Sequence, residues 1–109
     1  MCMNTFTLDN LPLDRETTTQ LLVALGDPVR IEICLLLGMG GRLNVTDIAA
    51  NFRVTRPAIS HHLKVLREAG ALRSENIGQE VFYWLNYPSL ESCLSGLLDV
   101  LRRCPRREG

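Results

Sequence analysis

The sequence lacks the features that mark membrane and secreted proteins. Apolar runs such as Ile33–Leu37 are far shorter than the ~20 residues that a transmembrane helix requires. No basic segment followed by an apolar one opens the chain, so we expect no secretory signal. The 4 cysteines are scattered without a C-x-x-C pair, which favours reduced thiols over a disulfide framework: Cys2, Cys34, Cys93 and Cys104. These absences predict a cytoplasmic protein that does not cross a membrane.

Catalytic motifs are also missing, and the chain is short. Its 109 residues correspond to about one domain, with 46% hydrophobic and 22% charged residues, as in soluble packed proteins. The glycines between Gly38 and Gly41 are not followed by the Lys and Ser/Thr of a phosphate-binding loop. Multi-domain enzymes are therefore excluded, and we expect no enzymatic activity. A core of this size also favours a second subunit.

Charge is unevenly distributed, although the formal net charge is +0. Residues 1–52 hold three basic and six acidic side chains, whereas residues 53–73 hold five basic side chains against Glu68 alone. The basic residues of this middle stretch are Arg53, Arg56, Lys64, Arg67 and Arg73. One explanation is a solvated helix face. The other, which we favour, is a surface that binds nucleic acid.

Hydrophobic periodicity and capping residues predict a mainly α fold with a small β-hairpin, in the order α-α-α-α-β-β-α. We expect a mobile arm over 1–12, one domain over 13–104 and a basic tail over 105–109. Within the domain, helices are expected at 13–25, 28–37, 44–52, 55–69 and 89–103, and strands at 71–74 and 80–85 around a turn at 76–78. Ile31, Cys34, Leu35 and Leu37 should form the buried face of the second helix. Five leucines should form one stripe on the last helix: Leu90, Leu94, Leu97, Leu98 and Leu101.

A tight turn joins the third and fourth helices, which is typical of a helix-turn-helix, and the hairpin at 71–85 would be its wing. Side chains off the apolar stripe of helix 55–69 are expected to bind double-stranded DNA, at base edges near the N-terminus and at phosphates further along. The expected contacts are Arg56, Pro57, Ser60, His61, Lys64 and Arg67 from the helix, and Arg73 and Gln79 from the wing. His61 and His62 point about 100° apart, so they do not readily share one metal ion.

Three segments resemble the ArsR/SmtB family of metal- and stress-sensing repressors. They are residues 24–33 (ALGDPVRIEI), 56–70 (RPAISHHLKVLREAG) and 78–85 (GQEVFYWL), in the family's order and spacing. The resemblance implies a winged-helix homodimer in which the first and last helices pair with those of a second copy. It also implies a palindromic operator near the protein's own promoter, and release from it when an inducer binds.

The resemblance leaves the inducer open. The arsenic-type site of the family places a Cys-Val-Cys at the start of the third helix, where this chain has the thiol-free residues 43–47. A second type of family site lies on the last helix, and here it would use Glu91, Cys93 and Cys104. Two thiolates and a carboxylate suit Zn²⁺ or another thiophilic metal or metalloid.

A signal without thiol chemistry, such as an organic molecule or a protein, is one alternative. Redox sensing is another that the resemblance offers, because some relatives use one cysteine on the second helix and one on the last. Here these would be Cys34 and Cys104, although Cys34 also fits a small core residue. Two functions of other classes remain at this point: a small thiol-redox protein using Cys104, and a winged-helix protein-interaction module without DNA binding.

Overall fold

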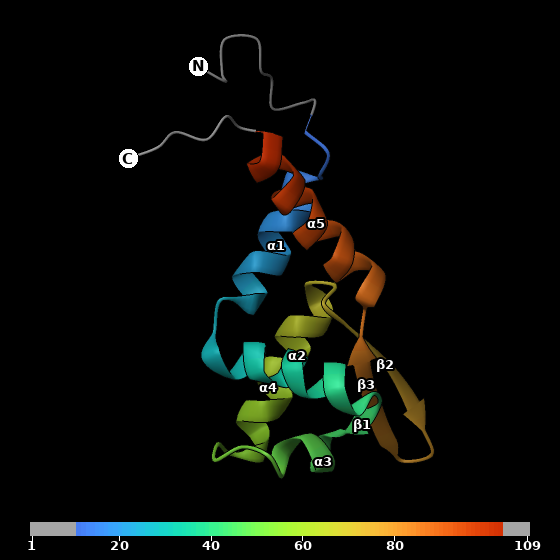
Figure 1. Cartoon of the computed structure of the whole chain (residues 1–109). Helices are drawn as coiled ribbons and strands as arrows, with labels where there is room; N and C mark the ends of the chain where they lie inside the picture. Colours follow the sequence, from blue (N-terminus) through green and yellow to red (C-terminus); the bar gives the residue numbers. More distant parts are fainter. Residues whose placement is uncertain (1–10, 104–109) are drawn as a thin grey trace.

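The computed structural model describes residues 11–103, which form a mainly helical molecule with a small antiparallel sheet (Figure 1). The elements in chain order are α1 (Arg15–Leu25), α2 (Pro28–Gly40), β1 (Leu43–Asn44), α3 (Val45–Ala49), α4 (Arg56–Glu68), β2 (Leu72–Ile77), β3 (Glu80–Leu85) and α5 (Tyr87–Arg103). This order confirms the winged helix-turn-helix and adds one strand. No helix within 11–103 is long and apolar enough to cross a membrane. The expected tail, and the expected arm apart from Leu11 and Pro12, lie outside the described residues.

The first four helices each begin at a side chain that accepts backbone N–H groups. Asp14 caps α1, Asp27 caps α2, Asn44 caps α3 and Thr55 caps α4. Such caps satisfy donors that the first helical turn leaves unpaired, so they fix where each helix starts. At α2 the backbone N–H groups of Arg30 and Val29 both donate to Asp27, and these bonds, first that of Arg30, hold the pKa of Asp27 below its usual value.

The sheet differs from the predicted two-stranded hairpin. It has three strands in the order β1-β3-β2, because the two residues of β1 pair with Tyr83 and Phe82 of β3. The turn predicted at 76–78 is also wrong, since Asn76 and Ile77 continue β2 and pair with β3. The chain reverses at 78–79 instead, where Gly78 has a φ of 66°. A positive φ at the first of the two turn residues favours glycine, so Gly78 determines where the turn forms.

The core lies where α1, α2, α3 and α4 meet. One of its largest fully buried side chains comes from each of α1, α2 and α3, and three come from α4: Leu21, Ile33, Ile48, Ile59, Leu63 and Leu66. The predicted buried face of α2 is wrong in part. Ile31 and Leu35 are 41% and 63% exposed, whereas Ile33 and Leu37 are buried, and Cys34 is half-buried. The run of apolar residues in α2 has no polar gaps, so periodicity alone does not identify its inner face.

α1 and α5 pack together at one end of the molecule, opposite the end that holds α3 and the tip of the hairpin (Figure 1). The predicted leucine stripe on α5 is divided between two faces. Leu90 and Leu97 join the core with Cys93, whereas Leu94, Leu98 and Leu101 are exposed.

Gly96 allows the segment before α1 to cross α5 closely. A Cβ at this position would lie 3.0 Å from the Cβ of Leu13 and 3.1 Å from the carbonyl oxygen of Pro12. A side chain there would push this segment away from α5.

We expect Gly96→Ala to lower the free energy of unfolding by about 1 kcal/mol, because overpacking outweighs the better helix propensity of alanine. Gly38→Ala is the matched control, since a Cβ on Gly38 would meet only Leu85 at an ordinary 3.5 Å. The control should gain stability by about 0.5–1 kcal/mol. Urea unfolding of both variants measures the difference, and equal gains in both would contradict the close crossing.

Candidate DNA interface

α4 has one buried and one exposed face. Ile59, Leu63 and Leu66 are fully buried against the core. The six side chains predicted from this helix to contact DNA are all exposed on it: Arg56, Pro57, Ser60, His61, Lys64 and Arg67. The helix therefore presents a polar, basic surface along its whole length.

The cations of this surface have no acidic partners in the described part of the chain. There, ion pairs join Arg42 to Glu75 and Arg103 to Asp99. Within residues 11–103, none of Arg53, Arg56, Lys64 and Arg67 forms an ion pair or a hydrogen bond through its side chain. Unpaired cations on one face produce a positive potential, and a phosphate backbone is a partner that neutralises it.

His61 and His62 have different environments, as their spacing predicts. His61 is exposed on the basic face, whereas His62 is half-buried. The Nδ1 atom of His62 lies 3.2 Å from a guanidinium nitrogen of Arg30, whose Nε donates to the carbonyl oxygen of Ala24. Arg30 thus connects the end of α1 to the middle of α4. His62 is part of this connection.

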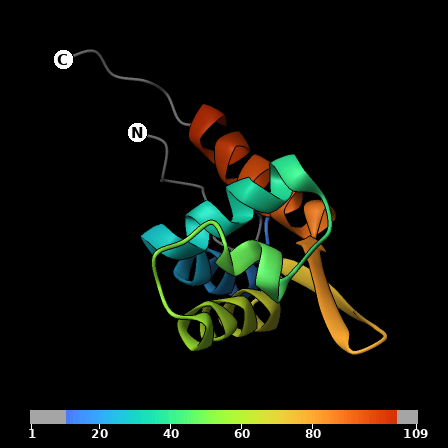
Figure 2. The same ribbon diagram turned by 90° about the horizontal axis from the view of Figure 1, so that it is seen from below.

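The hairpin extends away from the helical body beside α4, which is seen most clearly from below (Figure 2). Gln79 lies in its turn, whereas Arg73 lies near the start of β2 and pairs across the sheet with Trp84. Gly78 lies five positions after Arg73, a distance of about 16 Å along an extended strand at 3.3 Å per residue. The two predicted wing contacts are therefore at opposite ends of the hairpin.

A cleft of about 140 Å³ connects α4 to the turn of the hairpin. It is lined by Asn44, Val45, Thr46, Arg56, Gln79, Glu80 and Val81. The structure thus brings together Arg56 and Gln79, which were predicted separately from helix and wing. Asn44 donates a 2.9 Å hydrogen bond to Glu80 across this cleft.

Arg42, just before β1, contacts the wing in a way that sequence reasoning missed. Its guanidinium lies 3.9 Å from the centre of the Trp84 ring and 3.2 Å from a carboxylate oxygen of Glu75. These contacts stabilise the hairpin. No local sequence signal identifies them, because the three residues come from separate segments.

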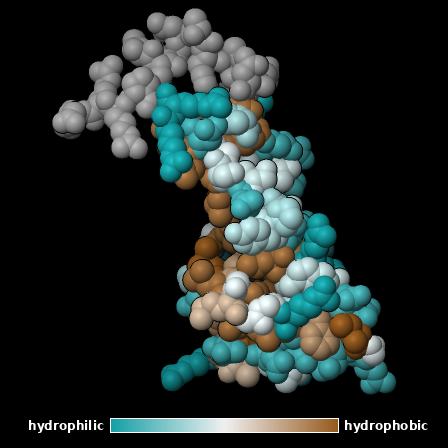
Figure 3. Space-filling view, turned by 45° about the vertical axis from the view of Figure 1, so that its right-hand side comes forward, coloured by the Kyte–Doolittle hydropathy of each residue, from teal (hydrophilic) through white to brown (hydrophobic). Residues whose placement is uncertain are grey.

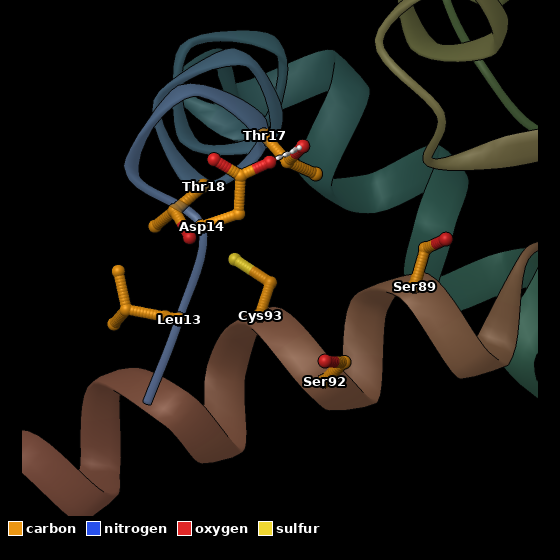
Figure 4. A pocket seen from close by; sticks show the side chains of 7 residues that line it. All are labelled: Leu13, Asp14, Thr17, Thr18, Ser89, Ser92 and Cys93. Atoms are coloured by element: carbon orange, nitrogen blue, oxygen red, sulfur yellow. Dashed lines mark hydrogen bonds between the residues drawn. The ribbon is translucent and has the colours of Figure 1, made fainter. Parts of the chain in front are cut away.

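The sulfur-based sites predicted for an inducer are only partly within the described residues. Cys93 is buried and points into a pocket of about 110 Å³ between the start of α1 and α5, whereas Glu91 is exposed (Figure 4). Cys104 lies outside the described residues. Over residues 11–103, no three His, Cys, Asp or Glu side chains are grouped so as to hold a metal ion. Burial raises the pKa of Cys34 to about 11, so this side chain is a neutral thiol at neutral pH.

Comparison with known proteins establishes the family. The sequence pattern of the bacterial regulatory protein, arsR family, matches residues 27–74, from α2 into β2. Over 80 residues the chain is 35% identical to the transcriptional repressor SdpR of Bacillus subtilis, covering 73% of this chain and 88% of SdpR. The chain belongs to the arsR family.

Two further similarities agree with this assignment. The arsenical resistance operon repressor of Escherichia coli is 35% identical over 89 residues, which cover 82% of this chain and 75% of that repressor. The solved structure of an ArsR-like transcriptional regulator from Rhodococcus sp. RHA1 superposes with a TM-score of 0.72 at 26% identity, covering 81% of this chain and 82% of that one.

The arsR-family chain is thus a DNA-binding transcriptional repressor and not an enzyme. This confirms the family, the fold class and the general function predicted from the sequence. Neither a thiol-redox protein nor an interaction module without DNA binding is favoured.

The raised pKa of Cys34 predicts a loss of stability at alkaline pH. The pKa is about 11 in the folded protein against 9.0 for a free thiol, so between these values the folded state holds a proton that the unfolded state has lost. The free energy of unfolding must therefore fall as the pH rises from 9 towards 11. Urea unfolding at pH 8 and pH 10.5 should show a larger loss for the wild type than for Cys34→Ala. Parallel losses would contradict the assigned pKa.

Proposed function

We propose that this repressor acts in the cytoplasm as a homodimer whose two α4 helices enter successive major grooves of a two-fold symmetric operator. The observation that carries the proposal is the exposed face of α4, whose cations have no ion pair within residues 11–103. In a two-fold helix-turn-helix dimer the recognition helices lie about one DNA turn apart, ~34–36 Å. The operator should therefore consist of two half-sites at that spacing.

The position of each side chain along α4 suggests whether it contacts base edges or phosphates. Arg56, Pro57, Ser60 and His61 lie in its first two turns, and we assign them to base edges in the major groove. Lys64 and Arg67 lie further along, and we assign them to phosphates. Gln79 in the turn of the hairpin shares a cleft with Arg56, so both would follow the same stretch of DNA. Arg73 would reach only flanking backbone.

The homodimer is supported by exposed apolar side chains on the paired helices α1 and α5. Leu94, Leu98 and Leu101 of α5 are 51%, 45% and 69% exposed, and Leu22 and Val23 of α1 are also exposed. Apolar surface gathers around the middle of the molecule, below the end that holds α1 and α5 (Figure 3). Large exposed apolar patches mark interaction surfaces, and a second copy of the chain supplies a matching one.

Substitutions on α4 test the DNA contacts. Lys64→Ala should weaken binding to all DNA sequences and reduce the slope of log K against log salt by about 1, because one phosphate contact is lost. Ser60→Ala should instead change which sequences are preferred and leave the salt slope unchanged. Fluorescence anisotropy over a salt series measures both, with Arg102→Ala at the far end of α5 as the control. If neither Lys64→Ala nor Ser60→Ala differs from the wild type, α4 is not the recognition helix.

The dimer face is tested by a charge on α5. Leu94→Asp should produce monomers, because a carboxylate cannot be buried in an apolar interface without a partner. Ile77→Asp is the matched control, since Ile77 is 50% exposed but lies on the wing. Sedimentation velocity should give a dimer for the wild type and the control and a monomer for Leu94→Asp. A dimeric Leu94→Asp protein would place the interface elsewhere.

For the inducer we propose a thiophilic metal or metalloid, with Glu91 and Cys93 of one protomer and Cys104 as its ligands. Two observations support a thiol-based signal at α5. Relatives include arsenical resistance repressors, and the thiol of Cys93 lies at the contact between α5 and α1. One protomer supplies no complete ligand set within residues 11–103, so the site would require Cys104 or a second copy. The competing redox pair, Cys34 with Cys104, is less favoured because thiolates are the reactive form and Cys34 is a neutral thiol.

Titration of the DNA complex identifies the signal. The reduced, metal-free protein is bound to labelled DNA from upstream of its own gene, and Zn²⁺, arsenite and a polysulfide are added separately. We expect arsenite or Zn²⁺ to lower the anisotropy, and Cys93→Ser/Cys104→Ser to abolish the effect. Release by polysulfide alone, abolished in Cys34→Ser, would establish redox sensing instead. A complex that resists all three agents would refute a thiol-based inducer.

A further inference from the structure

Asn86 is the single residue between the wing and α5, and its side chain has an unusual environment. It follows Leu85, the last residue of β3, and precedes Tyr87, the first of α5. Its Oδ1 atom is buried and has no hydrogen-bond partner among the described residues. A buried polar atom without a partner is rare in folded proteins and costs stability, so its presence calls for an explanation.

The rest of Asn86 ties α5 to the end of α4. Its side-chain Nδ2 donates to the carbonyl oxygen of Gly70 at 3.0 Å, and its backbone N–H donates to the carbonyl oxygen of Ala71 at 2.9 Å. Its own carbonyl oxygen accepts the N–H of Leu90 in the first turn of α5 at 3.1 Å. Gly70, with a φ of 89°, is where the chain leaves α4 for β2. One residue thus bonds both the end of the recognition helix and the start of α5.

The side chain does this instead of capping its own helix. Asn86 precedes the first residue of α5, and asparagine is among the preferred N-cap residues. In α1, α2, α3 and α4 the residue at this position accepts backbone N–H groups through its side chain. The Oδ1 of Asn86 accepts none, because its amide is turned towards Gly70. The amide therefore serves as a tether to α4 through Nδ2, while its Oδ1 caps no N–H of α5.

We infer that Asn86 is a positioning residue that fixes the end of α4 relative to α5 and so sets how well the recognition helix discriminates between DNA sequences. The inference rests on the proposed role of α4 as the recognition helix. Asn86 is assigned no contact with DNA. A change in α5 that turns the amide away from Gly70 removes this bond, and the end of α4 then holds the orientation that reads base edges less firmly.

The test replaces the donor without changing the size of the side chain. Asn86→Asp cannot donate to Gly70 when ionised, and its carboxylate is a good N-cap. Asn86→Ala removes the donor without adding charge. Asn51→Asp is the matched control, because the Nδ2 of Asn51 also donates to a backbone carbonyl oxygen, that of Asp47, but away from α5.

The readout is the ratio of affinities for DNA from upstream of the gene and for a scrambled duplex. We expect both Asn86 variants to lose at least tenfold in this ratio while their affinity for scrambled DNA changes less than threefold. A merely structural role lowers both affinities together, through the folded fraction, and leaves the ratio unchanged. Ratios within twofold of the wild type for both variants would overturn the inference, as would an equal loss in Asn51→Asp.

Hydrogen–deuterium exchange without DNA separates this inference from the proposed function. In the Asn86 variants, the backbone amides around residues 67–72 should exchange faster than in the wild type. The exchange rates in α1 should be unchanged. A wild-type protein with no preference for the upstream DNA would refute the operator assignment. Unchanged exchange at 67–72 would refute the tether, whatever the DNA result.

Discussion

The structure depends on the burial of one face of α4. Ile59, Leu63 and Leu66 are fully buried, and each contributes about 1.5–3 kcal/mol through the removal of apolar surface from water. This anchoring allows the opposite face to hold Arg56, Lys64 and Arg67, which form no ion pair within residues 11–103. Like charges repel, and the packing of the reverse side offsets this cost. Stability comes from one side of the helix, and the proposed DNA contacts lie on the other.

The orientation of α4 is fixed at three places along its length. Thr55 caps its first turn, Arg30 connects His62 in its middle to the end of α1, and Asn86 holds the carbonyl oxygen of Gly70 just beyond its end. Each contact comes from a different segment of the chain. Recognition of base edges requires accurate placement, because hydrogen bonds weaken steeply when distance and angle change.

Much of the fold follows from local signals in the sequence. The caps at Asp27, Asn44 and Thr55, and the three-and-four spacing on α4, predict the helices and the exposed basic face correctly. Local signals fail where contacts with residues distant in sequence determine the structure. The inner face of α2 is set by its neighbours, since the run at 33–37 is apolar throughout. The strand β1 has only two residues and exists because β3 offers an edge to pair with.

The candidate site shows the same division between local and long-range information. The exposure of each proposed DNA-contact residue on α4 was predictable from amphipathic spacing, because the buried face determines the exposed one. Other contacts join residues that are distant in sequence, so no local sequence pattern predicts them. They are the contacts of Arg42 with Trp84 and Glu75, and the hydrogen bond from Asn86 to Gly70.

α5 connects the two ends of the molecule. Gly96 brings α5 close to the segment before α1, and Asn86 joins α5 to the end of α4. The exposed leucines of α5 form the surface that a second copy would cover. A displacement of α5, whether from the proposed dimer contact or from the proposed ligand Cys93, would therefore act on the chain at Asn86. The wing and α4 meet at that same junction, so one small rotation there would shift both parts of the proposed DNA-binding surface together.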